Sequence, residues 1–213
     1  AYLSQIVESR IIEGYEYVLA QRRRYNQTNG AEGAYVVATN SSWGYQGLKE
    51  EDYPLWCAIY DSLGHAGVIN VAATDNQNIN VDVQGDLPTS CTSPYLITVT
   101  STGRDGAKLN QAAYGVTTID LAAPGADIYT TFIGNNYNYD AGTSMASPLV
   151  AGSVGLLYAS PCPSLPLLSQ ADPGEAALLA KDLLLRSVVE DASLVNRTVT
   201  GGRLNVYNAL QLL

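Results

Sequence analysis

Apolar residues recur at the three-to-four-residue spacing of a helix along several stretches of the chain. This spacing places them on one face of an amphipathic helix that packs on a core. The longest such face runs from Ile6 to Leu19, and Arg22, Arg23 and Arg24 follow it, where we expect a solvated helix end. We predict helices over residues 3–28, 51–64, 144–158, 174–189 and 205–212.

Short runs of β-branched and small apolar residues lie between these helices. Each is bounded by Gly, Pro, Asn or Asp, which favour turns. We predict strands over residues 34–39, 68–73, 95–100, 118–122 and 128–132, and loops over residues 77–94, 135–140 and 160–173. Residues 101–117 are expected to form a polar loop or a weak hairpin. Strands that alternate with helices usually form a mostly parallel sheet with helices on both faces, so the sequence predicts an α/β fold.

Composition limits the classes to which this chain can belong. Its 213 residues are 46% hydrophobic and 15% charged, so we expect a folded protein with a single domain over residues 1–213. The formal net charge of −9 at pH 7 argues against a nucleic-acid partner. No apolar run is long enough to span a membrane.

The strongest chemical signal lies between Gly142 and Pro148, where the sequence reads Gly-Thr-Ser-Met-Ala-Ser-Pro. Ser144 falls where a loop becomes a helix. The unpaired N–H groups and partial positive charge of a helix N-terminus suit an oxyanion, so this position suits a nucleophile. We expect Pro148 to be tolerated because it lies near the first helical turn. For Ser144 alone, a helix cap without catalytic function is the alternative.

The whole heptad closely resembles the nucleophile motif of the subtilisin-like serine proteases, the subtilases. The resemblance implies a three-layer subtilisin-like fold and a serine endopeptidase that cleaves peptides or proteins, with Ser144 as its nucleophile. A second match, at the end of the predicted strand over residues 68–73, implies that Asn76 is the oxyanion-hole amide. Asp75 departs from the family, which usually has Gly there, and its carboxylate is expected to alter the loop or repel the developing charge.

The resemblance also implies a substrate-binding surface. Ser42, Trp43 and Gly44 match the subtilase segment that pairs with an extended peptide, so their backbone would bind the substrate main chain as an added strand. Ala73 and Thr74 would form the opposite wall of the primary specificity pocket.

A general base for Ser144 is missing from the sequence. The one histidine, His65, does not lie in the His-Gly-Thr context of the subtilase catalytic histidine, and no aspartate lies in an Asp-Thr-Gly or Asp-Ser-Gly context. Subtilases carry Asp, His and Ser in this order along the chain. We therefore expect the Asp and the His to come from an upstream segment absent from this sequence, and the chain alone to hydrolyse peptides negligibly.

Two other functions share parts of this pattern. A pseudoprotease or peptide-binding module would keep the fold without activity, and the sequence that precedes Ala1 would decide between it and an enzyme. An α/β-hydrolase would need glycine where Ala146 stands and a histidine after the serine. No histidine follows residue 65, so we exclude it.

Subtilases often bind calcium, so a structural calcium ion is possible, although no cofactor is required. Asp75, Asp82 and Asp86 share one loop-rich stretch, but their spacing matches no calcium motif and solvated loop acids are the alternative.

The cysteines Cys57, Cys91 and Cys162 fit no metal-binding spacing. The sequence allows either three free thiols or one disulfide with one free thiol. If a disulfide forms, we expect it between Cys57 and Cys91. The family resemblance implies secretion.

Overall fold

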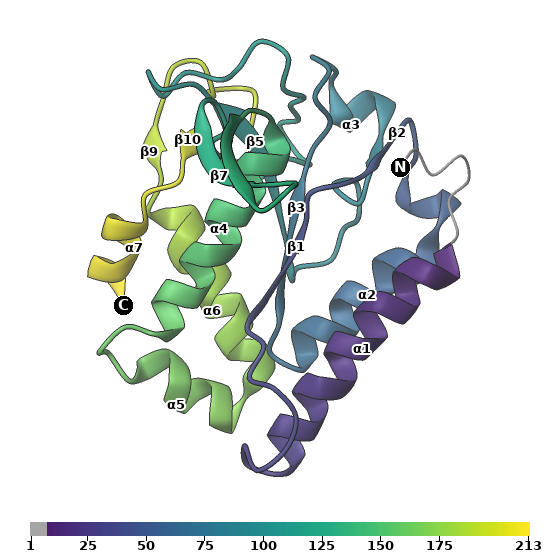
Figure 1. Ribbon diagram of the computed structural model, residues 1–213, viewed down its shortest axis with the longest axis vertical. Coiled ribbons are helices and arrows are strands. Elements are labelled where there is room, and N and C mark those ends of the chain that lie inside the picture. Colours follow the sequence, from purple (N-terminus) through teal and green to yellow (C-terminus); the bar gives the residue numbers. More distant parts are fainter. Residues whose placement is uncertain (1–7) are drawn as a thin grey trace.

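A six-stranded sheet forms the centre of the computed structural model, which describes residues 8–213 (Figure 1). The strands lie in the order β1 (Ala38–Ser41), β3 (Ile69–Ala73), β5 (Leu96–Thr102), β6 (Leu121–Pro124), β10 (Gly202–Arg203) and β9 (Val189–Glu190). Neighbours from β1 to β10 pair in parallel, and β9 pairs antiparallel with β10. The predicted α/β fold with a mostly parallel sheet is therefore confirmed.

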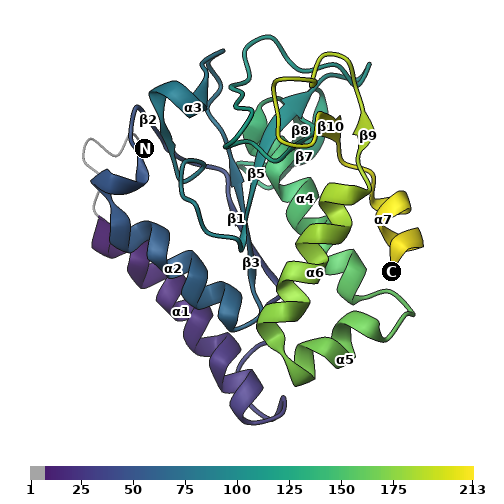
Figure 2. The same cartoon turned by 180° about the vertical axis from the view of Figure 1, so that it is seen from behind.

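Helices cover both faces of this sheet, which gives the molecule three layers (Figures 1 and 2). On one face, α4 (Thr143–Tyr158) packs against β1, β3, β5 and β6. On the other lie α2 (Pro54–His65) and α6 (Pro173–Arg186), and α1 (Glu8–Gln27) packs along α2. Shorter helices are η1 (Glu50–Asp52), α3 (Val81–Gln84), α5 (Ser164–Ala171) and α7 (Val206–Leu212). Ile6, expected on the first helix, lies outside the described residues.

Side-chain alternation along β3 explains why both faces bind helices. Successive side chains of a strand point to opposite faces. Ile69 and Val71 accordingly join the core under α4, whereas Ala72 joins the core under α2. On α4, Val150 and Val154 are fully buried, and burying each such side chain contributes about 1.5–3 kcal/mol. This packing fixes the first turn of α4 beside the carboxyl ends of β1 and β3.

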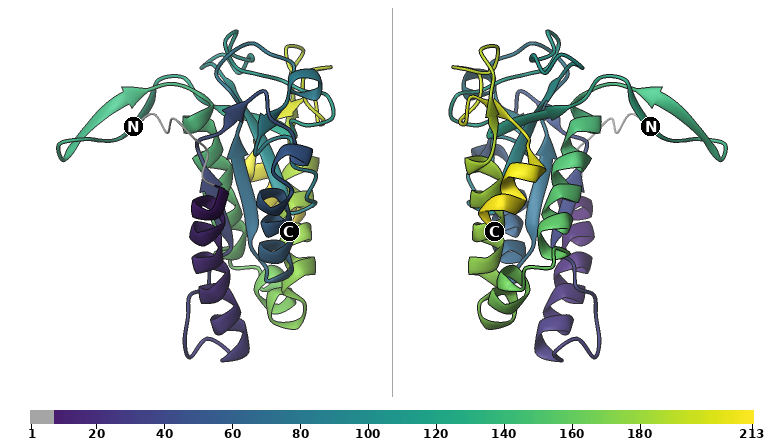
Figure 3. Two further views of the ribbon diagram at one scale, coloured as in Figure 1. Left: turned by 90° about the vertical axis from the view of Figure 1, so that its right-hand side faces the viewer. Right: turned by 90° about the vertical axis from the view of Figure 1, so that its left-hand side faces the viewer.

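Three segments predicted as loops contain regular structure, and the first, over residues 77–94, includes α3 and a short strand at Asp86–Leu87. Residues 136–140 form β8 (Asn136–Asp140), which pairs antiparallel with β7 (Ile128–Phe132) outside the central sheet. Figure 3 shows this hairpin projecting away from the body of the molecule. The proline-rich connection contains α5, because Pro163 lies at its N-cap and Pro166 in its first turn, where a backbone N–H has no helical acceptor.

Arg22 is fully buried, contrary to the solvated helix end that the sequence suggested. Its guanidinium donates from Nε to Ala66 O at 3.0 Å, from Nη1 to Val36 O at 3.0 Å and from Nη2 to Ser169 Oγ at 2.8 Å. These bonds offset the cost of burying the charge. They also hold residues 34–37 against α1, so the first strand begins at Ala38 rather than at residue 34.

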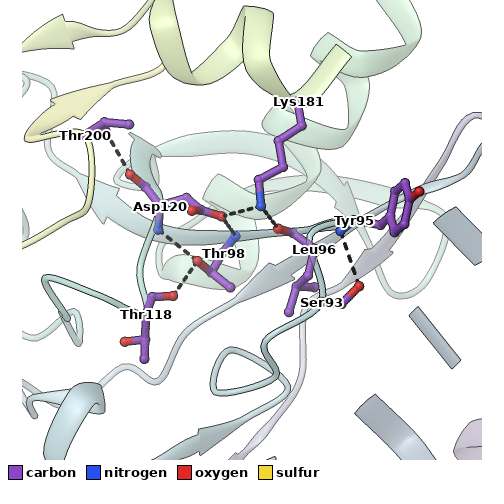
Figure 4. A network of polar contacts seen from close by, with 8 residues as sticks. All are labelled: Ser93, Tyr95, Leu96, Thr98, Thr118, Asp120, Lys181 and Thr200. Carbon is purple, nitrogen blue, oxygen red and sulfur yellow. Dashed lines mark hydrogen bonds and ion pairs between the residues drawn. The ribbon is translucent and has the colours of Figure 1, made fainter. Parts of the chain in front are cut away.

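A polar network joins β5 and α6 at the amino ends of the strands (Figure 4). Lys181 donates from Nζ to Leu96 O and lies 3.5 Å from Asp120 Oδ2. Thr98 N donates to the same carboxylate oxygen at 3.0 Å, and Asp120 N donates to Thr98 Oγ1 at 2.8 Å. Because the network lies at the end of the sheet opposite the first turn of α4, its role is structural.

One disulfide links α2 to the loop that follows β4. It joins Cys57 to Cys91, with 5.3 Å between their Cα atoms, and Cys162 is free. The pairing expected from the sequence is therefore present. Within residues 8–213, no helix combines the length and apolar character needed to cross a bilayer.

Candidate active site

The site residues predicted from the sequence meet in one cleft at the carboxyl ends of β1 and β3. The cleft has a volume of about 510 Å³. Its lining residues are Ser42, Trp43, Gly44, Ala73, Thr74, Asp75, Asn76, Gln77, Asp86 and Ser144. Ser144 and Asn76 therefore face a common space, although β5, β6 and the β7–β8 hairpin lie between them along the chain.

Ser144 is the second residue of α4 and is half-buried. Its N–H lies in the first helical turn and so has no acceptor within the helix. Its hydroxyl donates to the carbonyl oxygen of Ser42 at 3.2 Å. A carbonyl cannot remove the proton, so this contact orients the hydroxyl without activating it.

Pro148 is in the second turn of α4, not near the first as expected. It therefore removes the N–H that would donate to Ser144 O, four residues earlier. Ser42 replaces that donor, because its Oγ donates to Ser144 O at 2.8 Å. Asn40 Nδ2 donates to Ser42 Oγ at 2.9 Å, and Ser147 Oγ donates to Asn40 Oδ1 at 2.7 Å. Side chains at the end of β1 thus complete the start of α4.

The side-chain amide of Asn76 is oriented by Thr143. The backbone N–H of Thr143 donates to Asn76 Oδ1 at 3.0 Å, and the Thr143 hydroxyl, which donates to Thr74 O, lies 3.2 Å from the same oxygen. Because Oδ1 is held by Thr143, the NH₂ group on the other side of the amide points away from Thr143. Gly142 makes this approach possible: its φ is 142°, and a Cβ there would lie 3.0 Å from Asn76 Oδ1.

Asp75, the departure from the family pattern, shapes the loop that carries Asn76. Its Oδ1 accepts from Gln77 N at 2.7 Å, which is an Asx turn. Its backbone N–H donates to Asp86 Oδ2 at 3.0 Å. The carboxylate that was expected to disturb the oxyanion site therefore accepts a hydrogen bond within its own loop, from the backbone of Gln77.

Asp86 lines the cleft and was not predicted there. It is the first residue of β4 (Asp86–Leu87), which pairs antiparallel with β2 (Tyr45–Gln46). In the chain, β2 comes directly after the Ser42–Gly44 segment. Its side chain is buried, and Oδ2 accepts from Thr74 Oγ1 at 3.0 Å, Asp75 N at 3.0 Å and Thr89 Oγ1 at 2.8 Å. Burial raises the pKa of Asp86 to about 6, against the lowering effect of these hydrogen bonds.

The three aspartates considered for calcium do not form a cluster. Asp82 accepts from the backbone N–H groups of Val116, Thr117 and Thr118, so it caps a turn elsewhere. Across residues 8–213, no group of three or more His, Cys, Asp or Glu side chains could hold a metal ion. A structural calcium ion remains a prediction that these aspartates do not support.

His65 lies far from the cleft. It ends α2 and precedes β3, whereas Asn76 follows β3. The five residues of β3 alone span about 16 Å. The imidazole Nδ1 lies 2.6 Å from Asp61 O. His65 is therefore not the base for Ser144, and no histidine lines the cleft.

The chain is similar to known proteins in sequence and in fold. A family model described as the subtilase family matches residues 9–202. Proteinase R of Parengyodontium album is 32% identical over 149 residues, which cover 70% of this chain and 34% of that protein. Subtilisin-like protease 2 of Plasmodium falciparum is 28% identical over 171 residues, 80% of this chain but 12% of that protein.

A similar fold is found among solved structures. One described as proteases from Pseudoalteromonas arctica PAMC 21717 superposes with a TM-score of 0.66 at 24% identity. The superposition covers 85% of this chain and 52% of that one. The chain thus spans about a third or less of the two protease sequences and about half of the solved chain.

Proposed function

The chain belongs to the subtilase family of serine proteases, and from this premise we propose that it supplies the nucleophile Ser144 and the oxyanion amide Asn76 of a serine endopeptidase. The observation that carries the proposal is the shared cleft, in which the side-chain oxygen Oδ1 of Asn76 accepts a hydrogen bond from Thr143 N–H at 3.0 Å. This contact leaves the Asn76 NH₂ group and the Ser144 N–H to serve the same oxyanion.

In the proposed reaction, Ser144 Oγ attacks the scissile carbonyl carbon while a base takes the hydroxyl proton. The negative charge that develops on the carbonyl oxygen accepts hydrogen bonds from Ser144 N–H and Asn76 Nδ2. The base then protonates the leaving amine, and water hydrolyses the acyl-enzyme. The substrate main chain pairs with Ser42, Trp43 and Gly44, and the side chain before the scissile bond enters between them and Ala73.

The base and its orienting carboxylate belong, in this proposal, to residues outside these 213. His65 is excluded by its position before β3, and the residues that line the cleft offer no imidazole. Hydrolysis of a peptide ester by the 213-residue chain should therefore be negligible, and the full-length gene product should be active. A normal protease rate for the 213-residue chain alone would contradict this division of the triad.

Two variants of the full-length protein test the roles assigned here. Ser144→Ala should abolish acylation. Asn76→Ala should lower kcat by about 10²–10³, the effect known for subtilisin when its oxyanion amide is lost. Ser153→Ala, which removes a hydroxyl bonded to Leu149 O within α4, is the matched control and should keep the wild-type rate.

An inactive full-length protein that still binds peptides in the cleft would favour the alternative of a peptide-binding module. We also propose an extracellular location, supported by the Cys57–Cys91 disulfide, since disulfides persist mainly in oxidising compartments. Secretion of the full-length protein by its native host would test this.

A further inference from the structure

One carboxylate in the cleft has an oxygen that the fold does not use. Asp86 Oδ2 accepts three hydrogen bonds, from Thr74, Asp75 and Thr89. Within residues 8–213, Oδ1 accepts none, yet it is not among the fully enclosed polar atoms that lack a partner. Oδ1 therefore keeps some surface open to the cleft that Asp86 lines.

The position of Oδ1 places it between the two walls of the cleft. A Cβ added to Gly44 would lie 3.4 Å from Oδ1, so this oxygen faces the backbone of the Ser42–Gly44 wall. Thr74, from the opposite wall, donates to the other oxygen of the same carboxylate. The carboxylate thus lies between the two walls of the cleft and contacts both of them.

The charge of this carboxylate is not compensated within the cleft. Its lining residues include Asp75 and Asp86 but no lysine, arginine or histidine. A buried carboxylate without a cationic partner is costly, and a ligand that brings a cation with N–H donors relieves that cost. Neutral and acidic side chains offer no such compensation.

We propose that Asp86 makes this cleft select substrates with lysine or arginine immediately before the scissile bond. This proposal rests on the proposed protease function, in which that side chain lies between the Ser42–Gly44 and Ala73–Thr74 walls. The aliphatic stem passes the small residues Gly44 and Ala73, and the charged end donates to Asp86 Oδ1. Asp86 is then a specificity-determining residue, held in place by its other oxygen.

The preference should depend on pH because burial raises the pKa of Asp86 to about 6, with a further upward contribution from the nearby Asp75. Above that value the carboxylate is charged and attracts the cation. As the pH falls through it, the carboxyl becomes neutral and the preference for a basic side chain shrinks.

A binding experiment tests the pocket without any need for catalysis. Benzamidinium and its neutral isostere benzamide are titrated by calorimetry into the 213-residue chain and into Asp86→Asn, which keeps the size of the side chain and one oxygen for its three donors but removes the charge. At pH 8, we expect benzamidinium to bind the wild-type chain about ten- to a hundredfold more tightly than benzamide, and Asp86→Asn to remove this difference. Equal affinities, no binding of either compound, or a preference that survives in Asp86→Asn would overturn the proposal.

A hydrolysis experiment separates this proposal from the proposed function. The full-length protein is assayed with two peptides that differ only in lysine or methionine before the scissile bond. Asp86→Asn should lower kcat/KM for the lysine peptide about ten- to a hundredfold more than it lowers kcat/KM for the methionine peptide. If the wild-type protein cleaves both peptides equally, the specificity proposal fails and the protease function stands. If it cleaves neither, the protease function fails, and the titration alone decides the chemistry of the pocket.

Discussion

The replacement of Ser42 by alanine should destabilise the protein less when Pro148 is also replaced by alanine, because both residues determine how one carbonyl is satisfied. In the native chain, Pro148 offers no N–H to Ser144 O, and Ser42 Oγ donates to that oxygen at 2.8 Å. Ser42→Ala alone therefore leaves the carbonyl without its protein donor. In the Pro148→Ala background, an N–H at position 148 can donate to Ser144 O as in a regular helix.

The magnitude follows from the cost of an unsatisfied acceptor. A partly buried carbonyl that loses its donor costs about 1–3 kcal/mol, so Ser42→Ala should lower the free energy of unfolding by roughly that amount. It also removes the acceptor of Asn40 Nδ2, but this loss is the same in both backgrounds and cancels in a double-mutant cycle. The remaining interaction between the two substitutions should be about 1 kcal/mol in favour of the double variant.

Chemical denaturation of the four proteins, with the disulfide intact and equal m-values, gives this interaction energy. Ser153→Ala provides the matched control, because its hydroxyl donates to Leu149 O and not to Ser144 O. It should combine additively with Pro148→Ala. If Ser42→Ala costs the same with proline or alanine at position 148, the assignment of Ser42 as the replacement donor is wrong.

Two further predictions concern the folded chain as a whole. Thiol titration in denaturant should detect only Cys162 before reduction and three thiols after it, and loss of the Cys57–Cys91 bond, which spans 34 residues, should lower the free energy of unfolding by about 3–4 kcal/mol; three thiols before reduction would exclude the bond. Because the pKa of Asp86 rises from 3.8 to about 6 on folding, the folded chain holds a proton that the unfolded chain has released between about pH 4 and 6. The free energy of unfolding should therefore fall by roughly 2–3 kcal/mol as pH rises through this window, and Asp86→Asn should flatten the profile. A slope that persists in Asp86→Asn would assign it to other groups. Asp82 acts below this window with the opposite sign: burial tends to raise its pKa, but hydrogen bonds from Thr118 and Thr117 lower it overall.

The parts of the site that the sequence could predict are those carried by local patterns. Ser144 lies in a heptad whose small residues and helix start can be recognised without a structure. Asn76 lies just beyond an apolar strand that ends at Ala73, and the carboxyl ends of parallel strands meet at one edge of a sheet. That topology places Asn76 at this edge, and the packing of α4 on the sheet brings Ser144 to the same cleft.

Asp86 shows what local patterns cannot supply. It lies in a stretch read as loop, and it reaches the cleft only because β4 pairs with β2 over two residues. Pairings this short have no periodicity that a sequence would display. The burial of Arg22 escaped prediction for a related reason: its acceptors are the backbone oxygens of Ala66 and Val36, which no side-chain pattern reports.

The same contacts bear on how the proposed enzyme would divide its work. Asn76 is held by Thr143 N–H, and the Ser144 backbone is held through Ser42, so both oxyanion donors are oriented by residues within this chain. Donors fixed in advance need no reorganisation when charge develops. A base from elsewhere has only to displace the Ser42 carbonyl, which lies 3.2 Å from Ser144 Oγ. Ligands that fill the cleft should therefore bind whether or not the base is present, whereas turnover should require it.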